Sequence, residues 1–581
     1  MKPTSEQEAI INSSGHIRIN AVAGSGKTST LIAYAKNLSP DKRILYLAFN
    51  KTVKTEAIQK FAAVGLSNVV SETAHSLAFK SVVPRFGYQI QTQAFKSYQL
   101  TSLLKLPLGK EKNTEFILAN HVLRYFTAYC NSAFTQLKEL PYKMLVQDEV
   151  AKKFVAQNEK QILFFAKELW QLMETKQIPV THDFYLKKFQ LLKPQLHFDY
   201  ILFDEAQDAS AVMLEMLRYQ KSTLILVGDS HQQIYGWRYA INSMERVPFP
   251  SFPLTQSFRF PEPIAQLATQ IVQYKNHLGK PQNIQLVGKG KVGPIKSRAV
   301  LARTNLGLLV KAIAWITEPK NKGDIYFEGN LNSYTYAEEG ASLYDVLNLQ
   351  LENRKLIRDP MIGRLKDLDE LEEYTKVTED AQLGMMIELV REYDAEIPII
   401  LNRLKNRHVP DSLKHQAAII FSTVHRCKGM EYDEVELVND FLSEEKLKKL
   451  ISDTPDLDIN VAKLSEEINL LYVAITRAKS LLKIPAILTP ENFIPCAEIE
   501  LTGKQMETTP SHLLPTSIKA RPKEKEKEKP KASYRPWTLA LDEELTTAFE
   551  EGESMEEISY AMGRTRGAIW SRLRKLGLVE E

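Results

Sequence analysis

The sequence has little cysteine and no long apolar segment. Its three cysteines, Cys130, Cys427 and Cys496, lie far apart among 581 residues. This excludes a disulfide framework and disfavours a zinc or iron–sulfur site. No stretch approaches the roughly 18 uninterrupted apolar residues of a membrane span, and the first residues lack the apolar core of a signal peptide. We therefore expect an intracellular protein without a membrane partner. The net charge of +4 is too small to argue for or against a polyanionic partner.

Two carboxylates stand directly after an apolar run. The stretch Tyr200 to Phe203 is typical of a buried strand, and Asp204 and Glu205 follow it. The carboxyl ends of strands are where open α/β sheets place their ligand sites. Asp204 can bind Mg²⁺ and Glu205 can act on a water molecule, a division of roles suited to hydrolysis of a nucleoside triphosphate. Such a pair is common by itself, so its meaning depends on a partner elsewhere in the chain.

A loop of small residues upstream is the expected partner. It runs from Ala21 to Thr28, follows an apolar stretch and precedes a helical pattern, as a phosphate-binding loop requires. Gly24 and Gly26 let the backbone approach phosphates at a helix N-terminus. Lys27 can reach the β and γ phosphates, and the Thr28 hydroxyl can bind Mg²⁺. Ala21 stands where a first glycine is usual, which is tolerable if its φ angle is negative. Together the two elements predict a nucleotide-binding site.

Strand and helix signals divide most of the chain into two α/β blocks, each interrupted by a helical insertion. In the second insertion, for example, Leu383, Met386, Ile387 and Val390 fall on one helix face. The predicted boundaries are 1–84 with 191–250 for the first block, 85–190 for its insertion, 251–339 with 411–490 for the second block, and 340–410 for its insertion.

The C-terminal part differs in character. Residues 502–535 are predicted to be a linker, because Lys519 to Lys531 alternates Lys and Glu and has no apolar residue beyond Ala520. A basic tether for nucleic acid is the alternative. Residues 536–581 have the periodicity of a small helical module with two acidic helices and a basic third helix. A helix-turn-helix of the Myb/SANT-like or homeodomain-like kind fits, with Arg564, Arg566 and Arg572 facing DNA. Such modules also bind proteins, so both partners stay open.

Further motifs point to one family. They are Thr4–Gln7, Leu47–Lys51, Thr73–Ser76, Val227–Arg238, Leu254–Phe260, Ser422–Tyr432 and Glu466–Lys479. In order and wording they resemble the UvrD/Rep family of superfamily 1 DNA helicases, and the F-box DNA helicase 1 branch in particular. Because the motifs begin at residue 4, we expect no F-box segment before them. The resemblance implies two RecA-like P-loop domains with helical insertions, an α/β fold to which the all-α C-terminal module is added.

The resemblance also implies roles at the nucleotide site. Gln7 would pair with adenine, Phe258 would stack on it and Glu431 would contact the ribose. Gln232 would sense the γ-phosphate and its attacking water, while Arg259 and Arg477 would reach the phosphates from the second block; surface salt bridges are the alternative for these arginines. The implied catalytic set is Lys27, Asp204, Glu205, Gln232, Arg259 and Arg477. The implied ATP-binding set adds Gln7, Ala23, Gly24, Ser25, Gly26, Thr28, Ser29, Phe258 and Glu431, and the implied metal ligands are Thr28 and Asp204.

A single strand of nucleic acid would lie against aromatic and polar side chains that follow the predicted β-strands. Phe49, Tyr235 and Trp237 can stack on bases, although aromatic residues after strands more often belong to a core. The candidates for phosphate contacts are His75, Arg238, Thr423 and His425.

The function implied is an ATP-dependent DNA helicase or translocase that moves 3′ to 5′ on single-stranded DNA in repair, recombination or replication. Expected cofactors are ATP and Mg²⁺. Expected partners are single-stranded DNA, DNA junctions or duplex, and DNA repair or replication proteins, with the chain as a monomer. Its location would be cytoplasmic and nucleoid-associated in a bacterium, or nuclear in a eukaryote. The alternatives are an ATPase that remodels RNA or strips proteins from DNA, and a DNA-binding regulator with an inert motor. Two departures from the family stand out: Ser29 replaces a common Arg, and the 340–410 insertion is short.

Overall fold

The computed structural model describes residues 2–503 except 110–111, 330, 336–341, 454–459 and 492, and then 539–550 with residues 558, 561, 562, 569, 572, 573, 576 and 578. The chain divides into two compact units, residues 1–334 with 407–514 and residues 335–406 with 515–581. Among the described helices, none is both long and apolar enough to cross a membrane. The linker predicted at 502–535 lies almost wholly outside the described residues.

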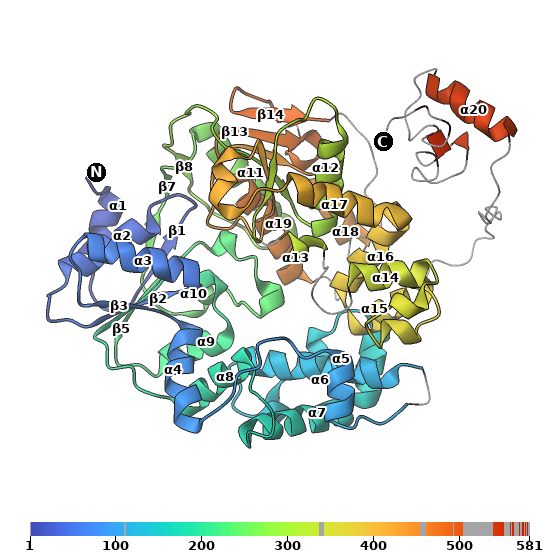
Figure 1. Ribbon diagram of the computed structural model, residues 1–581. Coiled ribbons are helices and arrows are strands. Elements are labelled where there is room, and N and C mark those ends of the chain that lie inside the picture. Colours follow the sequence, from blue (N-terminus) through green and yellow to red (C-terminus); the bar gives the residue numbers. More distant parts are fainter. Residues whose placement is uncertain are drawn as a thin grey trace. The chain divides into compact units, whose positions relative to one another are not determined.

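A six-stranded, wholly parallel sheet forms the first domain of unit 1 (Figure 1). Its spatial order is β3-β2-β4-β5-β1-β6. The strands are β1 (Ile17–Ala21), β2 (Ile44–Ala48), β3 (Val69–Thr73), β4 (Tyr200–Phe203), β5 (Thr223–Gly228) and β6 (Ser251–Leu254). The helices that accompany them are α1 (Ser5–Ile11), α2 (Lys27–Asn37), α3 (Lys51–Ala63), α4 (Ala74–Phe86), α9 (Ala211–Arg218) and α10 (Ser243–Arg246).

The alternation of side chains along β2 explains how this sheet is covered on both faces. Leu45 and Leu47 belong to the hydrophobic cluster that includes the inserted helices. Ile44, Tyr46 and Ala48 belong to the cluster shared with α1, α2 and α3. Because successive residues of a strand point to opposite faces, a continuous apolar run is what a doubly covered parallel strand requires.

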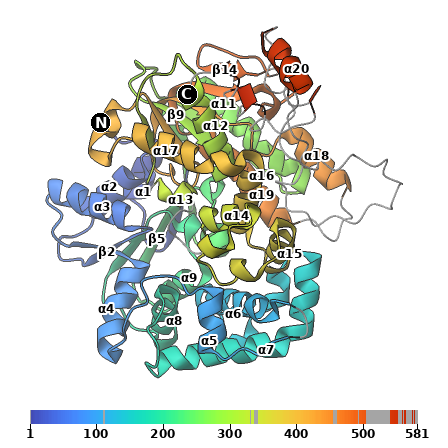
Figure 2. The same cartoon turned by 45° about the vertical axis from the view of Figure 1, so that its right-hand side comes forward.

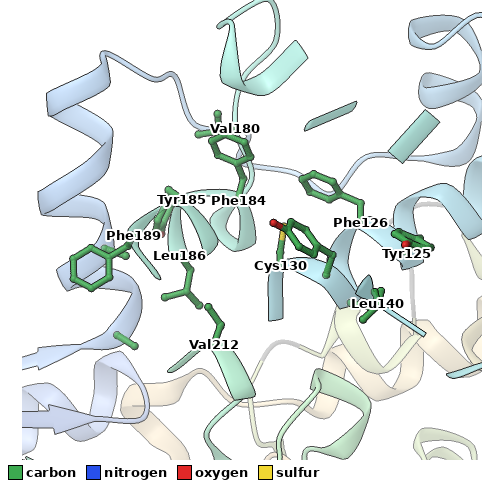
Figure 3. Packing of buried hydrophobic residues seen from close by; sticks show 14 of the residues in the cluster. Tyr125, Phe126, Cys130, Leu140, Val180, Phe184, Tyr185, Leu186, Phe189 and Val212 are labelled. Carbon is green, nitrogen blue, oxygen red and sulfur yellow. The ribbon is translucent and has the colours of Figure 1, made fainter. Parts of the chain in front are cut away.

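The helical insertion of the first domain packs around the cluster that contains Leu45. It consists of α5 (Ser97–Leu103), α6 (Thr114–Asn131), α7 (Glu149–Glu174) and α8 (His182–Leu192). The helices α6 and α7 lie side by side in both views (Figures 1 and 2). Figure 3 shows side chains of α6, α8 and α9 meeting in the shared interior, among them Phe126, Cys130, Phe184, Leu186 and Val212.

A second parallel sheet with the order β10-β11-β9-β12-β13-β14 forms the other domain of unit 1. Its strands are β9 (Arg298–Ala302), β10 (Ile325–Phe327), β11 (Ile419–Thr423), β12 (Tyr432–Leu437), β13 (Ala478–Pro485) and β14 (Ile499–Thr502). A two-stranded ribbon pairs β7 (Gln256–Ser257) with β8 (Val287–Gly288). The helices of this part of the chain are α11 (Glu262–Gln273), α12 (Asn305–Thr317), α13 (Asn332–Thr335), α18 (Glu444–Asp453) and α19 (Val461–Ile475).

Two edge strands lie beyond the domain boundaries expected from sequence. β6 belongs to the first sheet although it begins after residue 250, and β14 belongs to the second sheet although it begins after residue 490. Each strand buries a single residue fully, Leu254 in β6 and Ile499 in β14, and β6 contains Pro253. Edge strands of this kind carry little hydrophobic alternation and tolerate proline, so their sequence signal is faint.

The described residues of unit 2 form helices joined by turns and loops, with no strand among them. It contains α14 (Leu343–Gln350), α15 (Leu368–Thr378), α16 (Ala381–Tyr393) and most of α17 (Ile397–Arg407), and separately α20 (Leu539–Glu550). The predicted face of α16 is confirmed, because Leu383, Met386, Ile387 and Val390 are all buried. In the C-terminal module, Leu545, Ile558, Ile569 and Leu573 form a small core. The α/β fold class with parallel sheets and helical insertions is thus confirmed.

The packing of α7 gives a stability prediction. Leu169 is fully buried on this helix, whereas Phe164 on the same helix is 60% exposed. We expect Leu169→Ala to destabilise the insertion by about 2–5 kcal/mol, because it leaves a cavity. We expect Phe164→Ala to change stability by less than about 0.5 kcal/mol. Urea unfolding of both variants checks this, and equal destabilisation by the two would contradict the packing described.

Candidate nucleotide and strand-binding site

The loop predicted to bind phosphates lies between the end of β1 and the start of α2. Gly24 and Gly26 have φ angles of +74° and +80°, a conformation that favours glycine. Ala21 has a negative φ angle, so alanine is tolerated where a first glycine is usual. The Ser25 hydroxyl is buried without a hydrogen-bond partner in the described chain. Since an unpartnered buried hydroxyl is costly, it fits a loop shaped to receive a polar ligand.

The carboxylates after β4 face this loop. Lys27 Nζ lies 3.4 Å from Glu205 Oε1, and the Thr28 hydroxyl donates to Asp204 Oδ2 at 3.4 Å. The buried Tyr46 hydroxyl of β2 donates to the same Asp204 oxygen. These contacts follow from the parallel sheet, which aligns the carboxyl ends of β1, β2 and β4 at one edge.

Burial and charge pairing set the protonation of this cluster. Burial raises the pKa of Asp204, and the neighbouring Glu205 charge adds to the effect. Burial would also raise the pKa of Glu205, but Lys27 and Lys428 outweigh it and hold that pKa at about 2. Burial by itself would lower the pKa of Lys27, but the carboxylates of Glu205 and Asp229 outweigh burial and raise that pKa. Lys27 and Glu205 are therefore an ion pair at neutral pH.

A second group of polar residues lies after β5. Gln232 is buried and donates through Nε2 to Asp229 Oδ2 at 2.8 Å. The Tyr472 hydroxyl of α19 donates to the same Asp229 oxygen at 3.0 Å and accepts the Ala23 N–H of the phosphate loop at 3.4 Å. Lys428 of the second domain donates to the Gln232 carbonyl at 2.6 Å and to the Asp208 carboxylate. The two domains of unit 1 are thus connected through buried polar contacts at the predicted phosphate site.

The two predicted arginines have different surroundings. Arg259 donates to Glu431 Oε2 at 2.9 Å and to the Thr476 carbonyl at 3.1 Å, and its charge acts on Lys27. Arg477 is fully buried, and its guanidinium donates to the carbonyls of Val473 and Met430. Burial and the nearby Arg259 charge lower the Arg477 pKa to about 10. Arg259 is therefore the more accessible of the two in this conformation.

The residues expected to bind the base lie around the same loop. Gln7 accepts the Thr4 N–H at 3.0 Å in a capping box of α1 and donates to the Thr30 hydroxyl at 3.2 Å. One of its amide hydrogens is left for a ligand. Phe258 is 39% exposed, and its N–H donates to the Gly24 carbonyl at 2.9 Å. The exposed face beside the phosphate loop is thus lined by an amide and an aromatic ring. Ser29, in the first turn of α2, is exposed.

The predicted strand-binding aromatics form one cluster. Phe49 and Tyr235 stack with ring centroids 5.4 Å apart. Trp237 lies edge-on to Tyr235 and to His425, at 6.4 and 6.3 Å, and remains 65% exposed. The Arg238 guanidinium lies 5.5 Å from the Trp237 ring centroid. We call Phe49, Tyr235, Trp237, Arg238 and His425 the aromatic platform.

Two other strand-contact candidates lie in less open surroundings. Thr423 is 4% exposed at the end of β11, which leaves little surface for a phosphate. His75 packs edge-on against Tyr185 of the helical insertion at 6.3 Å. Burial lowers the pKa of His75 although Asp183 opposes this, so the ring is neutral at pH 7. Burial likewise lowers the pKa of His425 to about 4.

In the C-terminal module, the predicted DNA-contact residue Arg572 pairs with an acidic residue of α20. Its guanidinium donates to both carboxylate oxygens of Asp542 in α20, at 2.6 and 2.5 Å. A bidentate pair of this kind fixes the orientation of the guanidinium, and the contact of Arg572 with DNA stays a prediction. Arg564 and Arg566 lie outside the described residues.

Comparison with known proteins supplies the family. The model of the UvrD/REP helicase N-terminal domain matches residues 3–245, and that of the UvrD-like helicase C-terminal domain matches residues 333–489. The chain belongs to the UvrD-like helicases.

Several named helicases are similar to this UvrD-like chain. F-box DNA helicase 1 of Gallus gallus is 30% identical over 544 residues, which cover 87% of the chain and 52% of that protein. F-box DNA helicase protein 1 of Schizosaccharomyces pombe is 28% identical over 86% of the chain and 59% of its own length. The ATP-dependent DNA helicase PcrA of Bacillus subtilis is 26% identical over 48% of the chain and 40% of its own length. The chain therefore spans little more than half the length of its F-box relatives. The crystal structure of an arterivirus nonstructural protein 10 helicase covers 82% of the chain and 60% of its own, at 9% identity and a TM-score of 0.27, too low for a comparison of folds.

Sequence reasoning about the UvrD-like site missed several residues that the structure places there. Asp229, Lys428 and Tyr472 lie inside motifs quoted above, but spacing alone assigns them no role. Tyr46 gives no signal, because an aromatic residue within a buried strand is typical of core. Asp208 follows the carboxylate pair, and burial raises its pKa to about 6 although Lys428 opposes this.

The Tyr46 contact generates a prediction about metal binding. Asp204 is one of the expected Mg²⁺ ligands, and the Tyr46 hydroxyl fixes one of its oxygens. Because loss of a hydrogen bond to a metal ligand commonly costs about 10–100-fold in metal affinity, we expect Tyr46→Phe to weaken Mn²⁺ binding in the presence of nucleotide by about tenfold. Electron paramagnetic resonance of Mn²⁺ measures this directly.

Tyr34→Phe is the matched control, because Tyr34 is buried in the same cluster as Tyr46. Equal Mn²⁺ affinity for Tyr46→Phe and Tyr34→Phe would show that the hydroxyl does not position the metal ligand.

Proposed function

We propose that the chain is an ATP-dependent DNA translocase and helicase that moves 3′ to 5′ on single-stranded DNA during repair, recombination or replication. One observation carries the proposal. The polar cluster at the end of the first sheet and the aromatic platform, with its exposed Trp237, belong to the same unit, and α19 contacts the loop between them. A nucleotide site alone would suit many ATPases. A stacking surface beside it favours a single-stranded partner.

The residues of the phosphate loop suit binding of ATP. Its glycine conformations, the unpartnered Ser25 hydroxyl and the Lys27 ammonium provide donors and charge for phosphates. Thr28 and Asp204 would hold Mg²⁺, which in such sites neutralises charge that develops on the transferred phosphoryl group. The hard oxygen donors of these two residues are the kind that Mg²⁺ takes.

Hydrolysis requires the Lys27–Glu205 ion pair to open. While Lys27 stays 3.4 Å away, the Glu205 pKa of about 2 makes that carboxylate a poor base. Phosphates that attract Lys27 would release Glu205, raise its pKa and leave it to orient and deprotonate water. The site would thus stay inactive until nucleotide binds. Gln232, held by its hydrogen bond to Asp229, would help to position the attacking water.

The second domain would contribute a charge that responds to the nucleotide. Arg259 is held by Glu431, which is half exposed, and an arginine that reaches a transferred phosphoryl group can accelerate the reaction by about 10³–10⁵. Cycles of ATP binding and release would change how the domains meet, and thereby alternate their grip on the strand. The 3′ to 5′ direction is proposed from the family.

The remaining assignments are also proposals. The partners would be single-stranded DNA, junctions or duplex, together with repair or replication proteins, and the chain would act as a monomer. It would work in the cytoplasm on the nucleoid in a bacterium, or in the nucleus of a eukaryote.

The phosphate site generates a prediction about catalysis. We expect Lys27→Ala and Glu205→Gln each to abolish most ATP hydrolysis, the first by weakening phosphate binding and the second by removing the base. Glu205→Gln should keep nucleotide affinity, measured with a fluorescent ATP analogue. The control is Lys42→Ala, since Lys42 is a half-exposed surface lysine. Near-normal hydrolysis by either site variant would refute the assignment.

The aromatic platform generates a prediction about strand affinity. Loss of one stacked ring costs about 1–3 kcal/mol, so we expect Trp237→Ala to raise the Kd for a single-stranded oligonucleotide by roughly 5- to 150-fold. Fluorescence anisotropy at fixed salt measures this. Phe164→Ala removes an exposed ring elsewhere and should leave the Kd unchanged. If both variants bind as the unmodified protein does, the platform does not hold the strand.

A further inference from the structure

The helix α19 contacts the loop from Asp229 to Gly236 at three successive points. Glu466 Oε1 accepts the Gly236 N–H at 3.0 Å. Asn469 Nδ2 donates to the Gln233 carbonyl at 2.8 Å. The Tyr472 hydroxyl donates to Asp229 Oδ2 at 3.0 Å. We call Glu466, Asn469 and Tyr472 the α19 strip.

The strip follows from helix geometry. Residues three apart are neighbours on a helix surface, and with a rise of about 1.5 Å per residue the strip is about 9 Å long. Its partners run the opposite way along the loop, from Gly236 back to Asp229. One stretch of the α19 helix therefore contacts the loop from Gly236 to Asp229.

The two ends of the strip lie at different predicted sites. At one end, Tyr472 also accepts the Ala23 N–H of the phosphate loop, and its partner Asp229 holds Gln232. At the other end, Gly236 directly precedes Trp237 of the aromatic platform. The approach there is close, because a Cβ atom on Gly236 would come within 2.3 Å of Glu466 Oε2.

We propose that Glu466 and Asn469 are positioning residues that couple the aromatic platform to the phosphate site. This inference rests on the proposed function. A helix moves as a stiff body, so a shift at Tyr472 when the nucleotide changes also shifts the acceptor that holds Gly236. The aromatic platform then moves with the phosphate loop. In the reverse direction, a bound DNA strand that fixes Trp237 also fixes α19. Through Tyr472, the helix then fixes Asp229 and Gln232.

The chemistry of Glu466 suggests a conservative variant. Burial raises the pKa of Glu466 to about 7, although the Gly236 N–H opposes this, so assays at pH 8 keep the carboxylate ionised. Glu466→Gln retains a carbonyl oxygen that can accept the Gly236 N–H, whereas Glu466→Ala removes the acceptor. Asn469→Ala removes the middle contact. Ser465→Ala is the matched control, because the buried Ser465 hydroxyl makes no hydrogen bond within the described chain.

The test measures hydrolysis without nucleic acid, the KM for ATP, stimulation by saturating single-stranded DNA, and strand affinity without nucleotide. We expect Glu466→Ala and Asn469→Ala to keep basal hydrolysis and KM close to those of the unmodified protein, while the stimulation factor falls about fivefold or more. Glu466→Gln and Ser465→Ala should keep most of the stimulation.

Other outcomes separate the possibilities. Full stimulation in Glu466→Ala overturns the coupling role. A loss of basal hydrolysis as large as the loss of stimulation also overturns it, because such a loss would indicate a structural role. Loss of stimulation in Glu466→Gln as severe as in Glu466→Ala also overturns it. If the unmodified protein itself shows no stimulation, the proposed function fails rather than the coupling.

Discussion

The parallel alignment of strands in the first sheet is the constraint on which the site depends. Since every pair in that sheet is parallel, all carboxyl ends meet at one edge. The phosphate loop after β1, the carboxylates after β4 and the Asp229 loop after β5 come together there, although they are separated by some two hundred residues of sequence. The helical insertion accounts for most of that separation. It packs on one face of the sheet.

The buried charges at this edge need partners, and the second domain supplies several of them. Lys428 pairs with Asp208, and Tyr472 hydrogen-bonds to Asp229. Val22 and Ala23 of the phosphate loop also pack into the hydrophobic cluster of the second domain. Breaking one member of such a pair leaves an uncompensated buried group, so motion between the domains must exchange these contacts for others. Phosphates are the obvious replacements for carboxylates as partners of Lys27 and Arg259.

The sequence predicts the regular parts of this architecture because their signals are local. Glycines before Lys27 and an apolar run before Asp204 each specify a strand followed by a loop, and the α16 stripe specifies a buried helix face. Long-range contacts are different. Nothing local distinguishes Tyr46 from a core residue, or Asn469 from a solvated polar residue in a helix. In the same way, nothing local in the basic helix indicates that the Arg572 guanidinium pairs with Asp542 within the module. Weakly patterned edge strands, such as β6 with its proline, also escape detection.

The proposed translocase function requires that single-stranded DNA accelerate ATP hydrolysis. The most direct measurement is steady-state hydrolysis without nucleic acid and with single-stranded DNA, single-stranded RNA or duplex DNA, all at one salt concentration because phosphate contacts depend on salt. We expect strong stimulation by single-stranded DNA and weaker effects of RNA and duplex. Hydrolysis that single-stranded DNA does not accelerate would refute the translocase function, and equal stimulation by RNA would refute the assignment of DNA as the substrate.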